Sequence, residues 1–246
     1  MIQAVIFDMD GVLLDTEALE LRCSNEALAA MGLPLSLSRE AYAETCSMSS
    51  ADYRLRLRQN LGEDFDFDCF QRRVSGLMAD DLSKNGVPMK NGVVETLSAL
   101  RANRIKTAVA TSTASEKTLR YLDELGIRRL FDVVCCGDMV ARNKPDPDIY
   151  EAAAKALGLP TADCVAVEDS RNGVLSAVSA GCATVMAPDL LQPDGRLSAM
   201  CVCVTDRLTN LPDIIARVNQ EKLNHRGPAG APHIIKESQN CETQQT

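Results

Sequence analysis

The chain has 246 residues, of which 46% are apolar and 24% are charged, so it is long enough for one large domain or two smaller ones with a buried core. Its 34 Asp and Glu residues outnumber its 26 Lys and Arg residues, and the formal net charge of -8 argues against nucleic acid and membrane surfaces as partners. The only two histidines, His225 and His233, lie in a polar C-terminal stretch, which excludes histidine-dependent nucleophiles and histidine-ligated metals from the folded body.

The N-terminal residues MIQAVIFD contain no basic segment followed by a long apolar run, and no stretch approaches the roughly 18 apolar residues of a membrane span. Ten cysteines are scattered without a CxxC spacing, which favours free, buried thiols. Both observations are typical of a cytoplasmic protein, so a cytoplasmic location is expected.

The predicted elements begin with an apolar strand over residues 4–7, after which the pattern becomes helical. Residues 17–84 show helical periodicity and no run rich in Val or Ile. The helices are predicted at 17–31, 38–45, 49–61 and 67–83. We therefore expect an inserted all-α cap domain over 16–85, with connections near 14–17 and 84–92.

The second half of the chain alternates short apolar runs with helical segments. Five further strands are predicted at 105–111, 131–136, 164–168, 182–187 and 201–204. This alternation predicts an α/β fold with a Rossmann-like, doubly wound parallel sheet of about six strands. The α/β core would comprise residues 1–15 and 86–220, and the polar stretch 221–246 is predicted to be a disordered tail.

Two carboxylates follow the first predicted strand. Asp8 and Asp10 lie in the sequence FDMDG, on a loop opened by Gly11, and the carboxyl ends of parallel strands are where open α/β sheets bind ligands. Two ionised carboxylates this close repel each other, so the pair suits one nucleophile and one acid/base. The alternative is an ordinary Asp-Gly turn.

Hydroxyl residues follow the second predicted strand. Thr111, Ser112 and Thr113 precede a predicted helix, where hydroxyls and unpaired backbone N–H groups can bind an anion. The same residues fit a helix N-cap, with Thr113 and Glu116 forming a capping box. The cap is the better-supported interpretation by itself, and it is compatible with a phosphate site.

A lysine lies on the loop after the third predicted strand. Lys144 precedes Pro145 and Pro147, and the prolines restrict the backbone on its C-terminal side. A lysine is usually a solvated surface charge, but a stiffened loop can also hold its ammonium group in one place.

The fourth predicted strand ends in two adjacent carboxylates, Glu168 and Asp169. Asp169 or Ser170 could simply be a helix N-cap. If Glu168 and Asp169 lie beside Asp8 and Asp10, however, four negative groups share one crevice, and a hard cation such as Mg²⁺ is needed to neutralise them.

Together these motifs resemble the haloacid dehalogenase superfamily, and within it the small-molecule phosphatases and β-phosphoglucomutases with a helical cap. The resemblance covers residues 1–215 and rests on four motifs in the expected order. They are FDMDGVLLDTE, VATST with Thr111, NKPDP with Lys144, and VEDS with Glu168 and Asp169.

The resemblance implies a phosphatase mechanism with an aspartyl-phosphate intermediate. Asp8 would attack phosphorus, while Asp10 would protonate the leaving alcohol and later activate water; Lys144 and Thr111 would complete the catalytic set. The implied phosphate-binding residues are Gly11, Thr111, Ser112, Thr113 and Lys144. The implied Mg²⁺ ligands are Asp8, Asp10 through its backbone carbonyl, Glu168 and Asp169.

The same resemblance gives a small phosphorylated metabolite, and a sugar phosphate in particular, as the substrate class. The candidates for contacting the leaving group are the cap residues Glu17, Glu20, Ser47 and Ser49. For the acidic residues, a solvated helix face is the better-supported interpretation. The first alternative function is a hexose-phosphate mutase. Similar mutases carry a histidine and an arginine in the cap, whereas this cap has Glu20 and no histidine. The second alternative is a non-catalytic binding or regulatory protein, and the sequence leaves the oligomeric state open.

Overall fold

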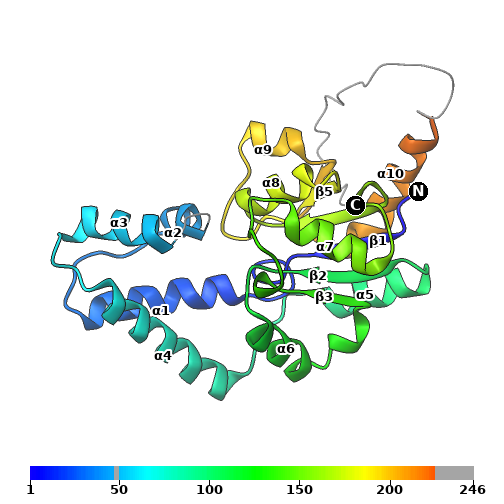
Figure 1. The fold of residues 1–246 in the computed structure, drawn as a ribbon. Helices are drawn as coiled ribbons and strands as arrows, with labels where there is room; N and C mark the ends of the chain where they lie inside the picture. Colours follow the sequence, from blue (N-terminus) through cyan, green and yellow to red (C-terminus); the bar gives the residue numbers. More distant parts are fainter. Residues whose placement is uncertain (47–49, 225–246) are drawn as a thin grey trace, which may run out of the picture.

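A computed structural model of the chain describes residues 1–46 and 50–224 (Figure 1). Its centre is a six-stranded, fully parallel sheet with the strand order β3-β2-β1-β4-β5-β6. The strands are β1 (Ala4–Phe7), β2 (Lys106–Ala110), β3 (Val133–Cys135), β4 (Cys164–Glu168), β5 (Ala183–Met186) and β6 (Cys203–Val204). The predicted fold class is confirmed. The strand order proceeds outward from β1 in one direction through β2 and β3, and from β4 in the other direction through β5 and β6. Such a switch in strand order opens a crevice at the carboxyl ends of β1 and β4.

The two faces of the sheet differ in side-chain size, as the alternation along β1 shows. Val5 and Phe7 belong to an apolar cluster on one face, and Ala4 and Ile6 belong to a cluster on the other. Helices on the first face are α5 (Val93–Ala102), α6 (Ser115–Glu124) and α10 (Leu211–Asn224). Helices on the second face are α7 (Asp148–Leu157) and α8 (Arg171–Ser179), and α9 (Gly195–Met200) packs against α8. Burial on both faces explains why the strands are continuous apolar runs.

The four helices predicted between the first two strands are present, and they lie beside the sheet rather than over it (Figure 1). They are α1 (Thr16–Ala30), α2 (Arg39–Cys46), α3 (Ser50–Leu61) and α4 (Phe67–Asn85). Their apolar side chains form a separate cluster that also includes Leu190 from the loop after β5. Helices α1–α4 therefore have a small core of their own.

The two connections between these helices and the sheet run side by side. The Asp15 amide donates to the Pro88 carbonyl over 2.9 Å, and the Lys90 amide donates to the Leu13 carbonyl over 2.9 Å. The Lys90 ammonium also lies 3.3 Å from Asp15 and 2.8 Å from Asp189. These contacts fix the first turn of α1 next to the end of β1.

Helix α10 extends past residue 221, where the sequence predicted the start of a disordered tail. The expected tail begins at residue 221, but α10 continues to Asn224, because Leu211, Ile214, Ile215 and Val218 anchor the helix to the sheet and its last turn extends beyond them. The rest of the predicted tail, residues 225–246, lies outside the described residues.

Two expectations from composition concern the membrane and the cysteines. In the described part of the chain, no helix combines the length and apolarity needed to cross a bilayer. Eight cysteines of the described part of the chain are free thiols, as their scattered spacing predicts.

Candidate active site

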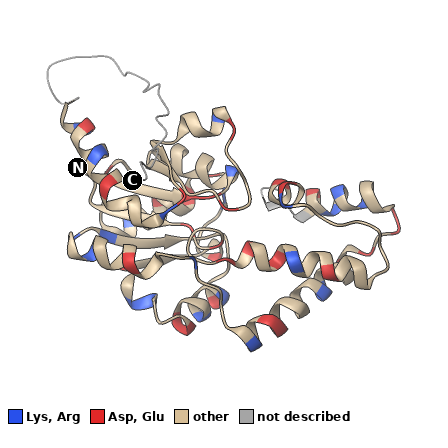
Figure 2. Cartoon of the chain, turned by 180° about the vertical axis from the view of Figure 1, so that it is seen from behind, with Lys and Arg blue, Asp and Glu red and all other residues tan. Residues whose placement is uncertain are grey.

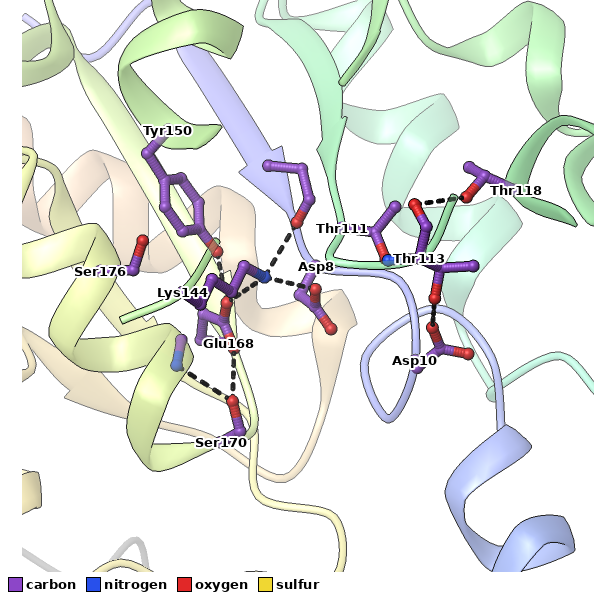
Figure 3. Close-up of polar contacts among 12 residues, drawn as sticks. Asp8, Asp10, Thr111, Thr113, Thr118, Lys144, Tyr150, Glu168, Ser170 and Ser176 are labelled. Carbon is purple, nitrogen blue, oxygen red and sulfur yellow. Dashed lines mark hydrogen bonds and ion pairs between the residues drawn. The ribbon is translucent and has the colours of Figure 1, made fainter. Parts of the chain in front are cut away.

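The carboxyl edge of the sheet brings Asp8, Lys144 and Glu168 together (Figure 3). The Lys144 ammonium lies 2.5 Å from Asp8 Oδ1, 2.6 Å from Glu168 Oε1 and 2.9 Å from the Ala110 carbonyl oxygen. The exposed fraction of the side chain is 7% for Lys144, 11% for Asp8 and 0% for Glu168. The ammonium therefore donates to two buried carboxylates and to the end of β2.

Burial and neighbouring charges shift the pKa values of Asp8 and Lys144 in opposite directions. Burial raises the pKa of the Asp8 carboxyl to about 7, although the Lys144 ammonium opposes the rise. Burial lowers the pKa of the Lys144 ammonium, but the Asp8 and Glu168 carboxylates outweigh it and hold this pKa above its ordinary value. Lys144 is consequently a fixed positive charge at neutral pH.

Glu168 is held by Tyr150, Ser170 and Gly173, none of which was among the predicted site residues. The Tyr150 hydroxyl donates to Glu168 Oε1 over 2.6 Å, and the Ser170 hydroxyl lies 3.3 Å from Oε2. A Cβ atom on Gly173 would lie 1.8 Å from Glu168 Oε2, so only glycine leaves room for the carboxylate. Ser170 also accepts the Gly173 amide at the start of α8, which confirms it as an N-cap.

Asp10 lies on the other side of Asp8 and is directed toward Thr113 (Figure 3). Its two carboxylate oxygens accept hydrogen bonds from the Thr16 hydroxyl over 2.5 Å and from the Thr113 hydroxyl over 2.8 Å. Thr16 is the first residue of α1, and Thr113 lies on the loop between β2 and α6. Asp10 is therefore positioned by two segments that are far apart in the sequence.

The predicted capping box of Thr113 and Glu116 is wrong. Helix α6 begins at Ser115 after Ala114, which has no side-chain cap hydrogen bond. The Ser115 amide and hydroxyl instead lie 3.1 Å and 2.6 Å from Asp138 Oδ1. Because Asp138 satisfies the helix terminus from a different loop, the Thr113 hydroxyl is available to Asp10.

Thr111 and Ser112 lie where the sequence placed them, at the carboxyl end of β2. Thr111 is buried, and its hydroxyl oxygen accepts the Thr113 amide over 3.1 Å. Ser112 is exposed, and its carbonyl oxygen approaches Gly137 so closely that a Cβ atom there would lie 2.2 Å away. This turn is therefore held firmly beside Asp10.

A group of carboxylates at this edge has the chemistry of a divalent cation site. Carboxylate oxygens of Asp8, Glu168 and Asp169 lie within 4.8 Å of one another. Asp169 is buried, and its pKa is raised well above the ordinary value by that burial and then by the carboxylates of Glu17, Asp8 and Glu168. An all-oxygen, negatively charged set fits Mg²⁺, which would relieve this repulsion.

The loop after β1 passes directly over Asp169. Gly11 has a φ of 81°, and a Cβ atom on it would lie 2.0 Å from Asp169 Oδ2. The close approach to Asp169 and the left-handed backbone both require glycine at this position. Packing of the backbone against Asp169 therefore explains why residue 11 is glycine. The predicted contact of Gly11 with the substrate stays a prediction.

A cavity of about 240 Å³ lies next to Asp10, between the sheet edge and helices α1, α2, α4 and α6. We call it the leaving-group cavity, after the role that the sequence resemblance predicts for the cap residues around it. Its lining residues are Asp10, Thr16, Glu17, Glu20, Tyr42, Met78, Thr113 and Lys117. The predicted residues Glu17 and Glu20 thus line a cavity rather than a solvated face, whereas Ser47 and Ser49 lie outside the described residues.

Comparison with known proteins places this geometry in a family. A sequence model of the haloacid dehalogenase-like hydrolases matches residues 5–187. The chain belongs to this family. The resemblance found in the four sequence motifs is confirmed.

Two curated relatives are similar over most of the chain. Protein CbbY of Rhodobacter capsulatus is 31% identical over 225 residues, which cover 86% of this chain and 99% of that protein. The phosphorylated carbohydrates phosphatase of Thermotoga maritima is 33% identical over 183 residues, which cover 73% of this chain and 82% of that protein.

A solved structure has the same architecture. The crystal structure of a CbbY mutant from Rhodobacter sphaeroides, in complex with xylulose-(1,5)bisphosphate, matches with a TM-score of 0.68 at 28% identity. The match covers 86% of this chain and 96% of that chain.

In this haloacid dehalogenase-like hydrolase, the cavity is lined both by residues of the sequence motifs and by residues outside them. Tyr42 on α2 and Lys117 on α6 were not among the predicted site residues. Lys117 has the helical spacing of an ordinary surface lysine, and Tyr42 follows an apolar pattern, so no motif distinguishes either of them.

Proposed function

We propose that this chain is a Mg²⁺-dependent phosphatase that hydrolyses a small phosphorylated metabolite, a sugar phosphate in particular, through an aspartyl-phosphate intermediate. The observation that carries the proposal is the Asp8 carboxylate, held by Lys144 at the end of β1, with Asp10 directed to the adjoining cavity. Family membership and the names of the phosphatase relatives support it.

In the first step, an oxygen of Asp8 attacks the phosphorus atom. The new bond joins Asp8 to phosphorus, the bond to the leaving oxygen breaks, and Asp10 transfers its proton to that oxygen. Phosphoryl transfer needs positioning and positive charge more than covalent assistance. Lys144 supplies a fixed charge, since its ammonium group already contacts Asp8 Oδ1.

In the second step, water attacks the phosphorus of the aspartyl-phosphate. Asp10 accepts a proton from this water, the bond between Asp8 and phosphorus breaks, and inorganic phosphate leaves. The hydrogen bonds from Thr16 and Thr113 keep the Asp10 carboxylate on the side of the leaving-group cavity, where both the alcohol and the water would lie.

The Mg²⁺ ion would be held by Asp8, Asp169, the backbone carbonyl of Asp10 and, directly or through water, Glu168. When bound, it would supply positive charge to the carboxylates and to the phosphoryl oxygens. Glu168 has a second role here, because its hydrogen bond to Lys144 orients the ammonium toward Asp8.

The test is phosphate release from p-nitrophenyl phosphate and a panel of sugar phosphates, with Mg²⁺ or with EDTA. Asp8→Asn should lower turnover about a thousandfold or more, because an amide cannot attack phosphorus. The matched control is Asp80→Asn, at an exposed position of α4, which should leave turnover unchanged. Full activity in a folded Asp8→Asn variant would refute the proposal, and isomerisation of a sugar phosphate without net phosphate release would favour the mutase.

A further inference from the structure

The leaving-group cavity is predominantly acidic. Three carboxylates, those of Asp10, Glu17 and Glu20, line it, and Lys117 is the only cationic side chain among its lining residues in the described part of the chain. In the proposed reaction Asp8 attacks the phosphorus of the substrate, and the leaving group lies on the side of Asp10, in this cavity. The charge carried by that part of the substrate therefore matters for binding.

Glu20 lies among these charges and is held by a hydrogen bond. Its carboxylate is half-buried on α1, and the Tyr42 hydroxyl hydrogen-bonds to it. Burial raises the pKa of Glu20, Lys117 opposes the rise, and Asp10 adds to it. Glu20 consequently lies within electrostatic reach of both Asp10 and Lys117, at the position that a leaving group next to Asp10 would contact.

Three arginines of the neighbouring helices are engaged in ion pairs away from the cavity. Acidic and basic residues are interspersed along α1–α4 (Figure 2), and three arginines there form ion pairs. These pairs are Arg22 with Asp81 at 2.7 Å, Arg54 with Asp68 at 2.6 Å, and Arg56 with Glu44 at 2.5 Å. The residues at 47–49 are Ser-Met-Ser, so that segment contributes no positive side chain.

We propose that Glu20 makes the site selective for singly phosphorylated substrates with a neutral, hydroxylated leaving group, and against leaving groups that carry a second phosphate or a carboxylate. The inference rests on the proposed phosphatase activity and names its substrate class. The Glu20 carboxylate accepts hydrogen bonds from substrate hydroxyls, and Lys117 donates to them. A second phosphate or a carboxylate on the leaving group would instead be repelled by the carboxylates of Glu17 and Glu20. Such repulsion lowers the affinity for anionic leaving groups and so makes the site selective. The crystal structure of the CbbY mutant holds xylulose-(1,5)bisphosphate, so the preference proposed for this chain differs from the ligand that a related protein binds.

The experiment compares kcat/KM for two matched pairs of esters. In the first pair, glycerol 3-phosphate carries a neutral hydroxymethyl group where 3-phosphoglycerate carries a carboxylate. In the second pair, glucose 1,6-bisphosphate carries a second phosphate that glucose 6-phosphate lacks. The unmodified protein should favour the neutral member of each pair by about tenfold or more, and Glu20→Gln should reduce that preference about tenfold. Glu20→Asp should retain the preference, and Lys117→Gln should increase it.

Glu26→Gln is the matched control, because Glu26 lies on the same helix and is exposed. It should leave the preference unchanged. A folded Glu20→Gln variant with an unaltered preference, or an unmodified protein that favours the anionic esters, would overturn the inference. Failure to release phosphate from any ester, p-nitrophenyl phosphate included, is a different result: it would refute the proposed function, and the inference with it.

Discussion

Replacing Lys144 with methionine tests the charge arrangement at the end of β1. Methionine keeps an unbranched apolar chain but removes the ammonium that contacts Asp8 and Glu168, both of which are buried. Removing one partner of a buried ion pair costs about 3–5 kcal/mol, because the remaining charge is left uncompensated. In a domain of 150–250 residues 1 kcal/mol corresponds to about 2–4 °C, so the expected loss in Tm is about 6–20 °C in Mg²⁺-free buffer.

The size of this loss should depend on pH. The folded-state pKa of Asp8 is about 7, above the ordinary 3.8, so stability falls as pH rises from 3.8 to 7. Without the Lys144 ammonium this pKa rises further, so the variant continues to lose stability above pH 7, where the unmodified protein no longer does. The difference between the two proteins should therefore be larger at pH 8.5 than at pH 6.

Urea unfolding at both pH values, in the presence of EDTA, measures the difference directly. The control is Lys155→Met, at an exposed position of α7, which should change the free energy of unfolding by less than about 0.5 kcal/mol. A loss for Lys144→Met below about 1 kcal/mol at pH 8.5, or the same loss at both pH values, would refute the reasoning.

Two further changes test the cation site and the space around Glu168. Saturating Mg²⁺ should stabilise the protein by about 2.7 kcal/mol when its concentration is a hundred times Kd. Thermal unfolding should show a larger Mg²⁺ shift at pH 8 than at pH 5.5, because protons compete for Asp8 and Asp169, whose pKa values are raised; equal shifts would contradict the assignment. Gly173→Ala should destabilise the protein by about 3 kcal/mol or more and lower activity, since its Cβ atom would lie 1.8 Å from Glu168 Oε2. Gly76→Ala, in the interior of α4 with nothing within 4 Å, is the control and should stabilise by about 0.5–1 kcal/mol; similar effects of the two substitutions on unfolding would show that the contact does not matter.

The sheet could be predicted from the sequence because its strands are buried on both faces. All four residues of β1, Ala4–Phe7, are buried, and the resulting apolar run stands out from the amphipathic helices around it. The predicted start of the tail, residue 221, falls inside α10 for the opposite reason. Residues 221–224 contribute no buried apolar side chain, since Leu223 is exposed, and they are helical because they continue a helix that is anchored at Leu211–Val218.

The charged residues of the site could also be predicted, since Asp8, Lys144, Glu168 and Asp169 lie in motifs at the ends of predicted elements. The structure brings these four residues to one edge of the sheet. The capping box could not be predicted correctly, because local spacing does not show that Asp138, from a loop 23 residues away, reaches Ser115 first. A long-range hydrogen bond thereby changed the role of Thr113 from helix cap to partner of Asp10.

The contacts that orient the site come from residues whose types carry no chemical signal. Tyr150 belongs to the apolar face of α7, yet its hydroxyl reaches Glu168 Oε1. Gly173 lies inside α8, where glycine weakens a helix, and its missing side chain provides the space for that same carboxylate. Both residues act on Glu168, and Glu168 in turn fixes the ammonium of Lys144. The position of the positive charge beside Asp8 is therefore set by packing between α7, α8 and β4, which only the folded chain reveals.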